Sequence, residues 1–308
     1  MASPLTEGEV VRVRASGKVN LVLRSGPRRP DGYHTLATVF QAVSVYDELD
    51  ARWAGPGQFS VAVQGEQADL VPTDDTNLAL RAAKLLARRF GSEELGCALT
   101  IRKAIPVTGG MAGGSADAAA ALLACSVLWD LDTSPDDLVT LGTRLGADVP
   151  FCLTGGTALG SDRGDRLAPV LSRGTYHWVL AFSEGELSTP AVFGRFDELR
   201  RDDAAALEVP AGLLNALIAG DPASLGACLV NDLEPAALSL RPGLQQVLAA
   251  GRDLGALGGI VSGSGPTVAF LVGDESAAID LSVGLASHGI CRSVKRVYGP
   301  VPGVRLIS

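Results

Sequence analysis

The feature that most constrains this chain is a glycine-rich run placed directly before its most strongly helical segment. The run begins at Pro106 and ends at Ser115, with four glycines among the six residues 109–114. The unpaired N–H groups and the positive dipole end of a helix bind phosphate, and glycines let the backbone approach it closely. The run therefore predicts an anion site, in which the Ser115 hydroxyl contacts a phosphate or a bound Mg²⁺. The alternative is an ordinary capped helix that follows a flexible turn.

The glycine-rich run matches neither of two common nucleotide-binding patterns. It contains no Gly-Lys-Ser/Thr, so it is not a P-loop, and it lacks the Gly-x-Gly-x-x-Gly spacing of a dinucleotide-binding fold. Elsewhere, strand-like and helix-like stretches alternate without a regular βαβ rhythm, which favours an α+β fold. A length of 308 residues is about twice that of a typical single domain, so we expect two lobes, residues 1–160 and 161–308.

Hydrophobic periodicity gives the expected elements along the chain. Strands are expected at residues 10–23 (interrupted at Ser16-Gly17, so that two strands result), 36–53, 97–105, 177–182 and 268–272. Helices are expected at residues 77–90, at 112–131 with Ser115 as N-cap, from Ser134 through Leu145, and two or three times between 205 and 258.

Composition excludes several classes of protein. The formal net charge is −8 and no long basic cluster occurs, so we expect no nucleic-acid partner. The five cysteines are odd in number and widely spaced, which favours reduced thiols over zinc or disulfides. No signal peptide and no apolar stretch of about 20 residues is evident. The expectation is a soluble cytoplasmic protein with no membrane and no obligatory protein partner.

Two charged residues have the character of catalytic groups. Lys18, between two strand-like stretches, could hold a transferring phosphoryl group or an acceptor hydroxyl by its charge. Asp148, between a helix end and an apolar stretch, could take the proton from an attacking hydroxyl. Local sequence supports equally well an Asp148 that only caps a helix or turns the chain.

Two further segments could face a ligand. The loop Val261-Ser-Gly-Ser-Gly-Pro-Thr267 is either a second ligand-facing loop or a tight turn before a strand. In the segment Arg29–His34, Tyr33 offers a ring for stacking and His34 a hydrogen-bonding group, although a structural role for His34 is a serious alternative. His177 and His288 have no motif around them, and we expect both to be structural.

Taken together and in order, these segments resemble the motifs of the GHMP kinases, and more closely those of the 4-diphosphocytidyl-2-C-methyl-D-erythritol kinases within that superfamily. The resemblance covers nearly the whole chain. The matching segments are Gly17–Leu21, Arg29–His34, Thr38–Gln41, Gly109–Ser115, Gly146–Pro150 and Ser262–Thr267.

The resemblance implies a two-lobed GHMP kinase fold, with an N-terminal ATP-binding domain and a C-terminal substrate-side domain. It implies ATP and Mg²⁺ as cofactors and phosphorylation of the 2-hydroxyl of a substrate that carries a cytidine diphosphate group, in the non-mevalonate route to isoprenoids. Asp148 then resembles the general base and Lys18 its charge partner.

The same resemblance assigns binding residues. Tyr33 and Phe193 resemble the pair that sandwiches the cytosine, and His34 the residue that reads its edge. The other implied substrate residues are Asn20, Thr189 and Pro190. The implied ATP residues are Asn77, Lys103, Pro106, Gly109, Gly110, Met111, Ala112, Gly113, Gly114 and Ser115.

Three positions depart from the family pattern. Ala112 stands where a third glycine is frequent and Ala116 where a second serine is frequent; both changes are small. Asp117 stands where Asn is frequent, and we expect it to face away from the phosphates as a cap residue, because an acid there would repel them. The rival functions are a GHMP kinase for mevalonate, homoserine or a sugar, and a non-catalytic nucleotide-binding protein, which could dispense with Lys18 or Asp148.

Overall fold

The computed structural model describes residues 9–90, 94–200 and 207–307. The strands are β1 (Val11–Arg28), β2 (His34–Trp53), β3 (Phe59–Gly65), β4 (Cys97–Lys103), β5 (Thr157–Asp162), β6 (Arg166–Pro169), β7 (Tyr176–Phe182), β8 (Val230–Asn231), β9 (Gly258–Val261), β10 (Thr267–Val272), β11 (Ser293–Gly299) and β12 (Arg305–Leu306). The helices are the 3₁₀ helix η1 (Ala68–Leu70), α1 (Leu78–Phe90), α2 (Gly113–Leu128), α3 (Pro135–Leu145), α4 (Val149–Thr154), α5 (Thr189–Leu199), α6 (Ala211–Ala219), α7 (Pro222–Gly226), α8 (Glu234–Leu240), α9 (Gly243–Asp253) and α10 (Glu275–His288).

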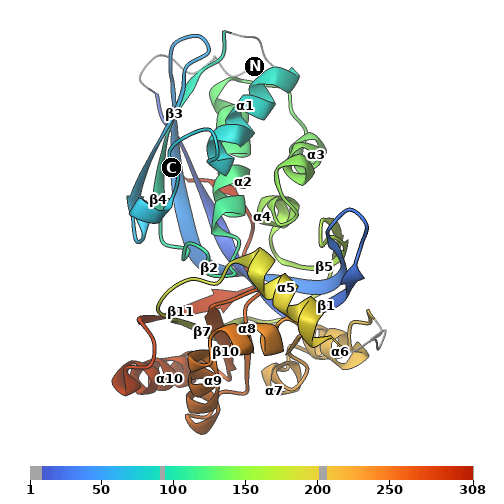
Figure 1. The fold of residues 1–308 in the computed structure, drawn as a ribbon. Coiled ribbons are helices and arrows are strands. Elements are labelled where there is room, and N and C mark those ends of the chain that lie inside the picture. Colours follow the sequence, from blue (N-terminus) through green and yellow to red (C-terminus); the bar gives the residue numbers. More distant parts are fainter. Residues whose placement is uncertain (1–8, 91–93, 201–206, 308) are drawn as a thin grey trace.

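Two sheets organise these elements, and the α+β prediction is confirmed (Figure 1). Within the described residues, the first sheet has eight strands. Its main path runs β12-β1-β2-β4-β3, with β5 and β6 continuing from β2 and with β8 parallel to β1. Helices α1 to α4 gather beside this sheet in the upper half of Figure 1. The second sheet has the order β11-β7-β10-β9 and lies in the lower half, with α9 and α10 below it.

The chain crosses between the two halves more than once. Strands β8 and β12 come from the last third of the sequence, yet both pair with β1 at the start of the chain. The division into residues 1–160 and 161–308 therefore stays a prediction.

The strand expected to break at Ser16-Gly17 is continuous, and this part of the prediction is wrong. β1 pairs with β2 on both sides of Gly17, with a shift of register between Ser16 and Gly17. Such a bulge bends a strand without ending it. Gly17 is suited to the position because a Cβ there would lie 3.0 Å from the Val45 side chain.

The expected helix at 112–131 is present as α2, but its N-cap is wrong. The N-cap is Ala112, so Ser115 is the third residue of the helix. Helix α2 is buried on nearly every side, because it packs between the first sheet and helices α1, α3 and α4. By contrast, α3 begins as expected: Ser134 and Asp137 form a reciprocal capping box.

The apolar run at residues 177–182 is β7, which is buried on both faces. Trp178 and Leu180 belong to the core that extends to the first sheet, whereas Val179 and Ala181 belong to the core formed with α8 to α10. Successive side chains of a strand point to opposite faces, so a strand between two cores is apolar throughout.

The described residues between 207 and 258 contain four helices, α6 to α9, where two or three were expected. Two of them, α7 and α8, have five and seven residues, which is too short for a clear helical period. Across the described residues, no helix combines the length and the apolar character that crossing a bilayer requires.

Candidate active site

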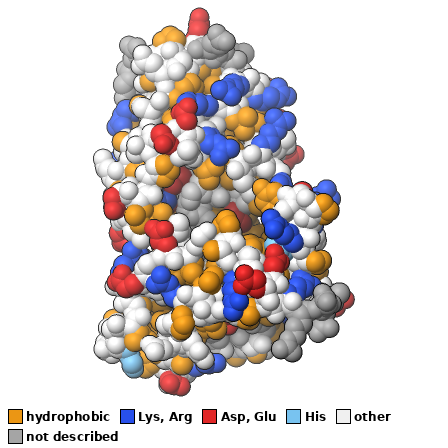
Figure 2. All heavy atoms as spheres, viewed as in Figure 1, with side chains coloured by type: hydrophobic (Ala, Val, Ile, Leu, Met, Phe, Trp, Pro, Cys, Tyr) orange, Lys and Arg blue, Asp and Glu red, His pale blue; other side chains and the backbone are white. Residues whose placement is uncertain are grey.

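A cavity of about 1030 Å³ lies where the two halves of the molecule meet. Its size is that of a pocket for a small-molecule ligand. The surface in Figure 2 is hollowed at mid-height, and Lys and Arg side chains gather above the hollow. Most of the residues singled out from the sequence line this cavity: Lys18, Asn20, Tyr33, His34, Pro106, Gly109, Gly110, Ala112, Gly113, Gly114, Ser115, Asp148, Thr189, Pro190 and Phe193. Asn77, Lys103 and Met111 are not among its lining residues.

The glycine-rich loop has a backbone shape that only small residues adopt readily. Gly110 has φ +72°, and a Cβ on it would come 2.0 Å from the carbonyl oxygen of Ser262. Ala112 also adopts the left-handed region, with φ +61°. The third glycine that is frequent in the family would accept this conformation without strain, so the alanine is tolerated at a cost.

The two glycine-rich loops contact each other through Gly110. The Gly110 carbonyl oxygen accepts hydrogen bonds from the Lys18 ammonium at 2.8 Å and from the Ser262 hydroxyl at 3.1 Å. Strand β1, the loop before α2 and the loop before β10 therefore meet at one carbonyl group.

Lys18 is buried, and its ammonium donates to the Asn20 side-chain oxygen at 2.7 Å. The Asn20 amide in turn donates to the Thr38 hydroxyl at 2.8 Å, so β1 and β2 hold this lysine in place. Burial lowers the pKa of Lys18 because it penalises the charged form, and the negative charge of Asp148 opposes that effect.

Asp148 is half-buried and directly precedes α4. Its carboxylate makes no capping hydrogen bond to that helix, so the geometry does not support the alternative of a capping aspartate. Its charge acts on both Lys18 and Cys152. Among the charged residues that line the cavity, Lys18 and Asp148 therefore interact electrostatically. The Asp148 carboxylate is not engaged in capping the helix that follows it.

The loop 261–267 is both a turn and part of the cavity wall. The Gly265 N–H donates to the Ser262 carbonyl at 2.8 Å, and Gly263 and Ser264 line the cavity. The Ser264 hydroxyl also lies 2.9 Å from the Thr189 hydroxyl at the start of α5. The loop is therefore a tight turn that also lines the cavity, and its contact with a ligand stays a prediction.

Asn231, which sequence reasoning missed, supports this second loop. Its buried side-chain amide donates to the carbonyl oxygens of Val261 and Gly263, each at 2.7 Å. Its side-chain oxygen accepts from the Leu233 N–H at 2.9 Å, a local turn typical of Asn. Glu234 accepts from the Val261 N–H at 2.9 Å. An Asn two residues before Leu233 could have indicated the local turn from the sequence. Nothing in the local sequence indicates that the Asn231 amide contacts the loop 261–267.

At the other end of the cavity, the side chains of Tyr33, His34 and Phe193 form a cluster of rings, the aromatic group. The His34 and Phe193 rings stack with centroids 4.6 Å apart, and His34 Nε2 lies 2.7 Å from an Asp197 carboxylate oxygen. Tyr33 is 56% exposed, with the Arg163 guanidinium 5.2 Å from its ring centroid. Asp197, four residues after Phe193 on the same helix, was not singled out from the sequence.

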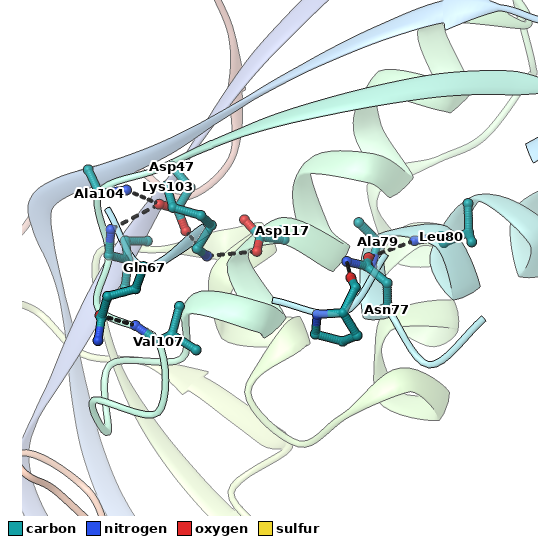
Figure 3. Close-up of polar contacts among 11 residues, drawn as sticks. Asp47, Gln67, Asn77, Ala79, Leu80, Lys103, Ala104, Val107 and Asp117 are labelled. Carbon is teal, nitrogen blue, oxygen red and sulfur yellow. Dashed lines mark hydrogen bonds and ion pairs between the residues drawn. The ribbon is translucent and has the colours of Figure 1, made fainter. Parts of the chain in front are cut away.

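Asn77 and Lys103, expected on the adenosine side, make structural contacts (Figure 3). The buried Asn77 side chain caps α1, accepting from the N–H groups of Ala79 and Leu80 at 2.9 and 3.2 Å. The Lys103 ammonium is buried against the carboxylates of Asp47 and Asp117. Their role in binding ATP stays a prediction.

The expectation that Asp117 is a cap residue is wrong. It lies inside α2, its side chain is 5% exposed, and a carboxylate oxygen contacts Lys103 Nζ at 2.7 Å. Burial raises the pKa of Asp117 to about 8; the attraction of Lys103 opposes this effect and the repulsion of Asp47 adds to it. The acid is kept from the phosphates by its burial beside Lys103, since it does not line the cavity.

Comparison with known proteins shows similarity along nearly the whole chain. The model of the GHMP kinases N terminal domain matches residues 77–156, and that of the GHMP kinases C terminal matches residues 213–291. A 4-diphosphocytidyl-2-C-methyl-D-erythritol kinase of Mycolicibacterium gilvum is 54% identical over 301 residues, which cover 96% of this chain and 92% of that protein. The enzyme of that name from Nocardia farcinica is 54% identical over 299 residues, covering 97% and 96%.

Solved structures agree on the fold. The crystal structure of a 4-(cytidine 5'-diphospho)-2C-methyl-D-erythritol kinase superposes with a TM-score of 0.76 at 32% identity, covering 93% of this chain and 98% of that one. A homoserine kinase from Cytophaga hutchinsonii gives a TM-score of 0.78 at 20% identity, with complete coverage of both chains. At that identity the second likeness shows the fold alone.

Proposed function

The chain belongs to the 4-diphosphocytidyl-2-C-methyl-D-erythritol kinases of the GHMP superfamily, and from this premise we propose that it transfers the γ-phosphoryl group of ATP to the 2-hydroxyl of 4-diphosphocytidyl-2-C-methyl-D-erythritol. Family membership makes the chain an ATP-dependent small-molecule kinase.

The phosphates of ATP bind at the loop before α2. Phosphoryl transfer requires in-line positioning and neutralisation of charge, with little covalent chemistry from the protein. The N-terminal turn of α2 supplies N–H groups at Gly113 and Gly114, both of which line the cavity. The Gly110 carbonyl is tied to Lys18 and Ser262, so the loop is shaped before the nucleotide arrives.

Asp148 accepts the proton of the attacking hydroxyl, and Lys18 orients that hydroxyl. Both side chains line the same cavity as the glycine-rich loop before α2, and the negative charge of Asp148 favours the charged form of Lys18. As the hydroxyl loses its proton, negative charge develops on its oxygen, and a fixed ammonium nearby stabilises that charge. A buried Lys18 is not masked by water, which strengthens this interaction.

The residues present fit a Mg²⁺ ion that is shared with the nucleotide. No cluster of three or more His, Cys, Asp or Glu within residues 9–90, 94–200 and 207–307 could hold a metal by itself. Mg²⁺ with nucleotides usually takes one or two protein ligands, the rest being phosphate oxygens and water. The Ser115 hydroxyl lines the cavity and would serve as such a ligand. The ion would neutralise phosphate charge when bound.

The cytosine end of the substrate binds at the aromatic group. Tyr33 and Phe193 offer ring faces for the base, and His34 offers a ring nitrogen to its edge. Stacking of a base on aromatic side chains contributes about 1–3 kcal/mol per base. Thr189 and Pro190 form the cavity wall at the start of α5, and Asn20 lies beside Lys18 toward the erythritol end.

The observation that carries the proposal is that one cavity joins the phosphate loop, Lys18 with Asp148, and an aromatic group suited to a base. Kinases for homoserine or mevalonate share the fold, so the fold does not choose among substrates. The aromatic group favours a substrate with a nucleobase.

The test is release of ADP from Mg·ATP with 4-diphosphocytidyl-2-C-methyl-D-erythritol, run in parallel with mevalonate, homoserine and galactose. We expect turnover with the cytidylylated alcohol only. Turnover with only one of the other alcohols would agree with a GHMP kinase but would refute the proposed substrate. No turnover with any of the four would favour a non-catalytic nucleotide-binding protein.

A further inference from the structure

His34 is enclosed by side chains of a single helix, α5. Phe193 stacks on its ring, and Phe196 approaches the ring edge with centroids 6.0 Å apart. The Asp197 carboxylate lies 2.7 Å from His34 Nε2. The His34 side chain is 5% exposed, whereas that of Asp197 is 32% exposed. The imidazole is therefore held at one nitrogen, with Phe193 on one ring face and Phe196 at an edge.

The contact with Asp197 decides which nitrogen of His34 carries the hydrogen. An ionised carboxylate can only accept hydrogen bonds. His34 Nε2 must therefore be the donor in this 2.7 Å contact. A neutral imidazole has one N–H, so the other nitrogen, Nδ1, has a free lone pair and can only accept.

We propose that Asp197 is a positioning residue that sets His34 to accept through Nδ1, so that the cavity selects a cytosine base over uracil. The inference rests on the proposed function, because it concerns the base of that substrate. The two bases differ where cytosine carries an exocyclic amino group and uracil a carbonyl oxygen. The amino group donates to the Nδ1 lone pair, and the carbonyl oxygen cannot.

Selection of this kind depends on a fixed tautomer. If the hydrogen could move to Nδ1, the same imidazole would donate to the uracil carbonyl, and discrimination would be lost. A polar group that faces an incompatible partner in a desolvated site loses its hydrogen bond and is not compensated by water. Because His34 is buried in the protein, this penalty applies to the wrong base.

The tautomer can be measured without any substrate. The chain has three histidines, so ¹⁵N-histidine labelling gives few signals, and His34→Gln identifies those of His34. At pH 8.5 we expect a protonated Nε2 and an unprotonated Nδ1 in the unaltered protein, and a mixture of tautomers in Asp197→Ala. A protonated Nδ1 in the unaltered protein, alone or together with Nε2, would overturn the inference.

The selectivity is measured as the ratio of kcat/KM for the cytidine substrate to that for its uridine counterpart. We expect Asp197→Ala to lower this ratio roughly tenfold or more, chiefly through KM, with kcat for the cytidine substrate little changed. Asp197→Asn keeps an acceptor oxygen, so we expect its ratio to lie between that of the unaltered enzyme and that of Asp197→Ala. An equal loss with both substrates would mean that Asp197 is merely structural and would overturn the inference.

Glu198→Ala is the matched control. Glu198 neighbours Asp197 on α5, is 66% exposed and pairs with Arg195 rather than with His34. We expect it to leave the ratio unchanged, and an equal fall in this variant would also overturn the inference. If the unaltered enzyme failed with both nucleotide substrates, the proposed function would fail and the selectivity with it. Turnover with an unchanged ratio in Asp197→Ala would refute the positioning role alone.

Discussion

The Lys103 ammonium lies 2.7 Å from an Asp117 carboxylate oxygen, buried beneath the first turn of α2. A Cβ on Gly113 would come 3.2 Å from that ammonium, so the pair lies directly below the phosphate loop. Asp47 also contacts Lys103, and it accepts the N–H groups of Ala104 and Ile105 at 2.6 and 2.9 Å. Two carboxyl groups thus share one ammonium in the core, and this arrangement makes stability depend on pH.

The raised pKa of Asp117 should make the folded protein less stable at alkaline pH. The folded-state pKa of Asp117 is about 8, above its ordinary value of 3.8, so the folded protein holds a proton that the unfolded chain releases between these values. Stability from this group is complete below about pH 4 and is lost as the pH rises through 8. We expect Asp117→Asn to reduce the fall in unfolding free energy between pH 5 and pH 8.5 by at least about 1 kcal/mol.

Urea unfolding at the two pH values measures this effect. Asp75→Asn is the control, since Asp75 is 83% exposed and pairs with Lys84 at the surface. We expect the control to behave as the unaltered protein does. An undiminished fall in Asp117→Asn would show that Asp117 is ionised throughout this range in the folded state.

Replacement of the proposed base tests the chemistry. Asp148→Asn keeps the size of the side chain but cannot accept a proton, so we expect kcat to fall by about 10²-fold or more. Binding of ATP, measured by calorimetry, should stay within about twofold. Loss of ATP binding together with turnover would indicate a structural role. Asp136→Asn, on the exposed first turn of α3, is the control and should retain full activity.

The charge of Lys18 should set the alkaline limit of activity. Burial lowers its pKa, so the ammonium loses its proton at a lower pH than an ordinary lysine, whose pKa is about 10.4. If the charged form is required, kcat/KM falls on the alkaline side before pH 10.4. The measurement is a pH–rate profile to pH 10, with circular dichroism over the same range. A rate that is flat to pH 10 would contradict the proposed role.

Loss of a ring from the aromatic group should weaken binding of the cytidylylated alcohol and leave binding of ATP nearly unchanged. We expect Tyr33→Ala or Phe193→Ala to raise KM for the cytidylylated alcohol roughly tenfold, because one stacking face is lost. KM for ATP should stay within about twofold. Tyr298→Ala is the control, since Tyr298 is half exposed on β11 and does not line the cavity. An equal rise of both KM values would mean that the cytosine does not stack on Tyr33 and Phe193.

Two glycines of the phosphate loop should differ in their tolerance of a methyl group. At Gly110 a Cβ would come 2.0 Å from a backbone oxygen, and φ is +72°. We expect Gly110→Ala to lower the unfolding free energy by about 2 kcal/mol or more and to weaken ATP binding. At Gly114 the nearest atom would be 3.5 Å away, an ordinary contact. Gly114→Ala should change stability by less than about 1 kcal/mol, and equal losses in both would refute this reading of the loop.

Features with a local cause could be predicted from the sequence. The glycine-rich loop before α2, the helices α1 to α3, the start of α3 after Ser134 and the strands β2, β7 and β10 all follow from periodicity or from residues a few positions apart. Two predicted boundaries were wrong because backbone conformation, and not the side-chain pattern, sets them. They are the bulge at Gly17, where β1 continues, and the left-handed Ala112, which is the N-cap of α2.

The sequence by itself thus determined which segments carry the glycine-rich loop and the candidate groups, including Lys18 and Asp148. Only the tertiary structure decided their partners. Asp197 reaches His34 across 163 positions. Asn231 reaches the second loop across about 30 positions. Asp117 on helix α2 is turned inward toward Lys103 on β4, which also contacts Asp47 on β2. The physical reason is that a buried polar group takes whichever partner the packing brings within hydrogen-bond distance, and its local sequence does not contain that partner.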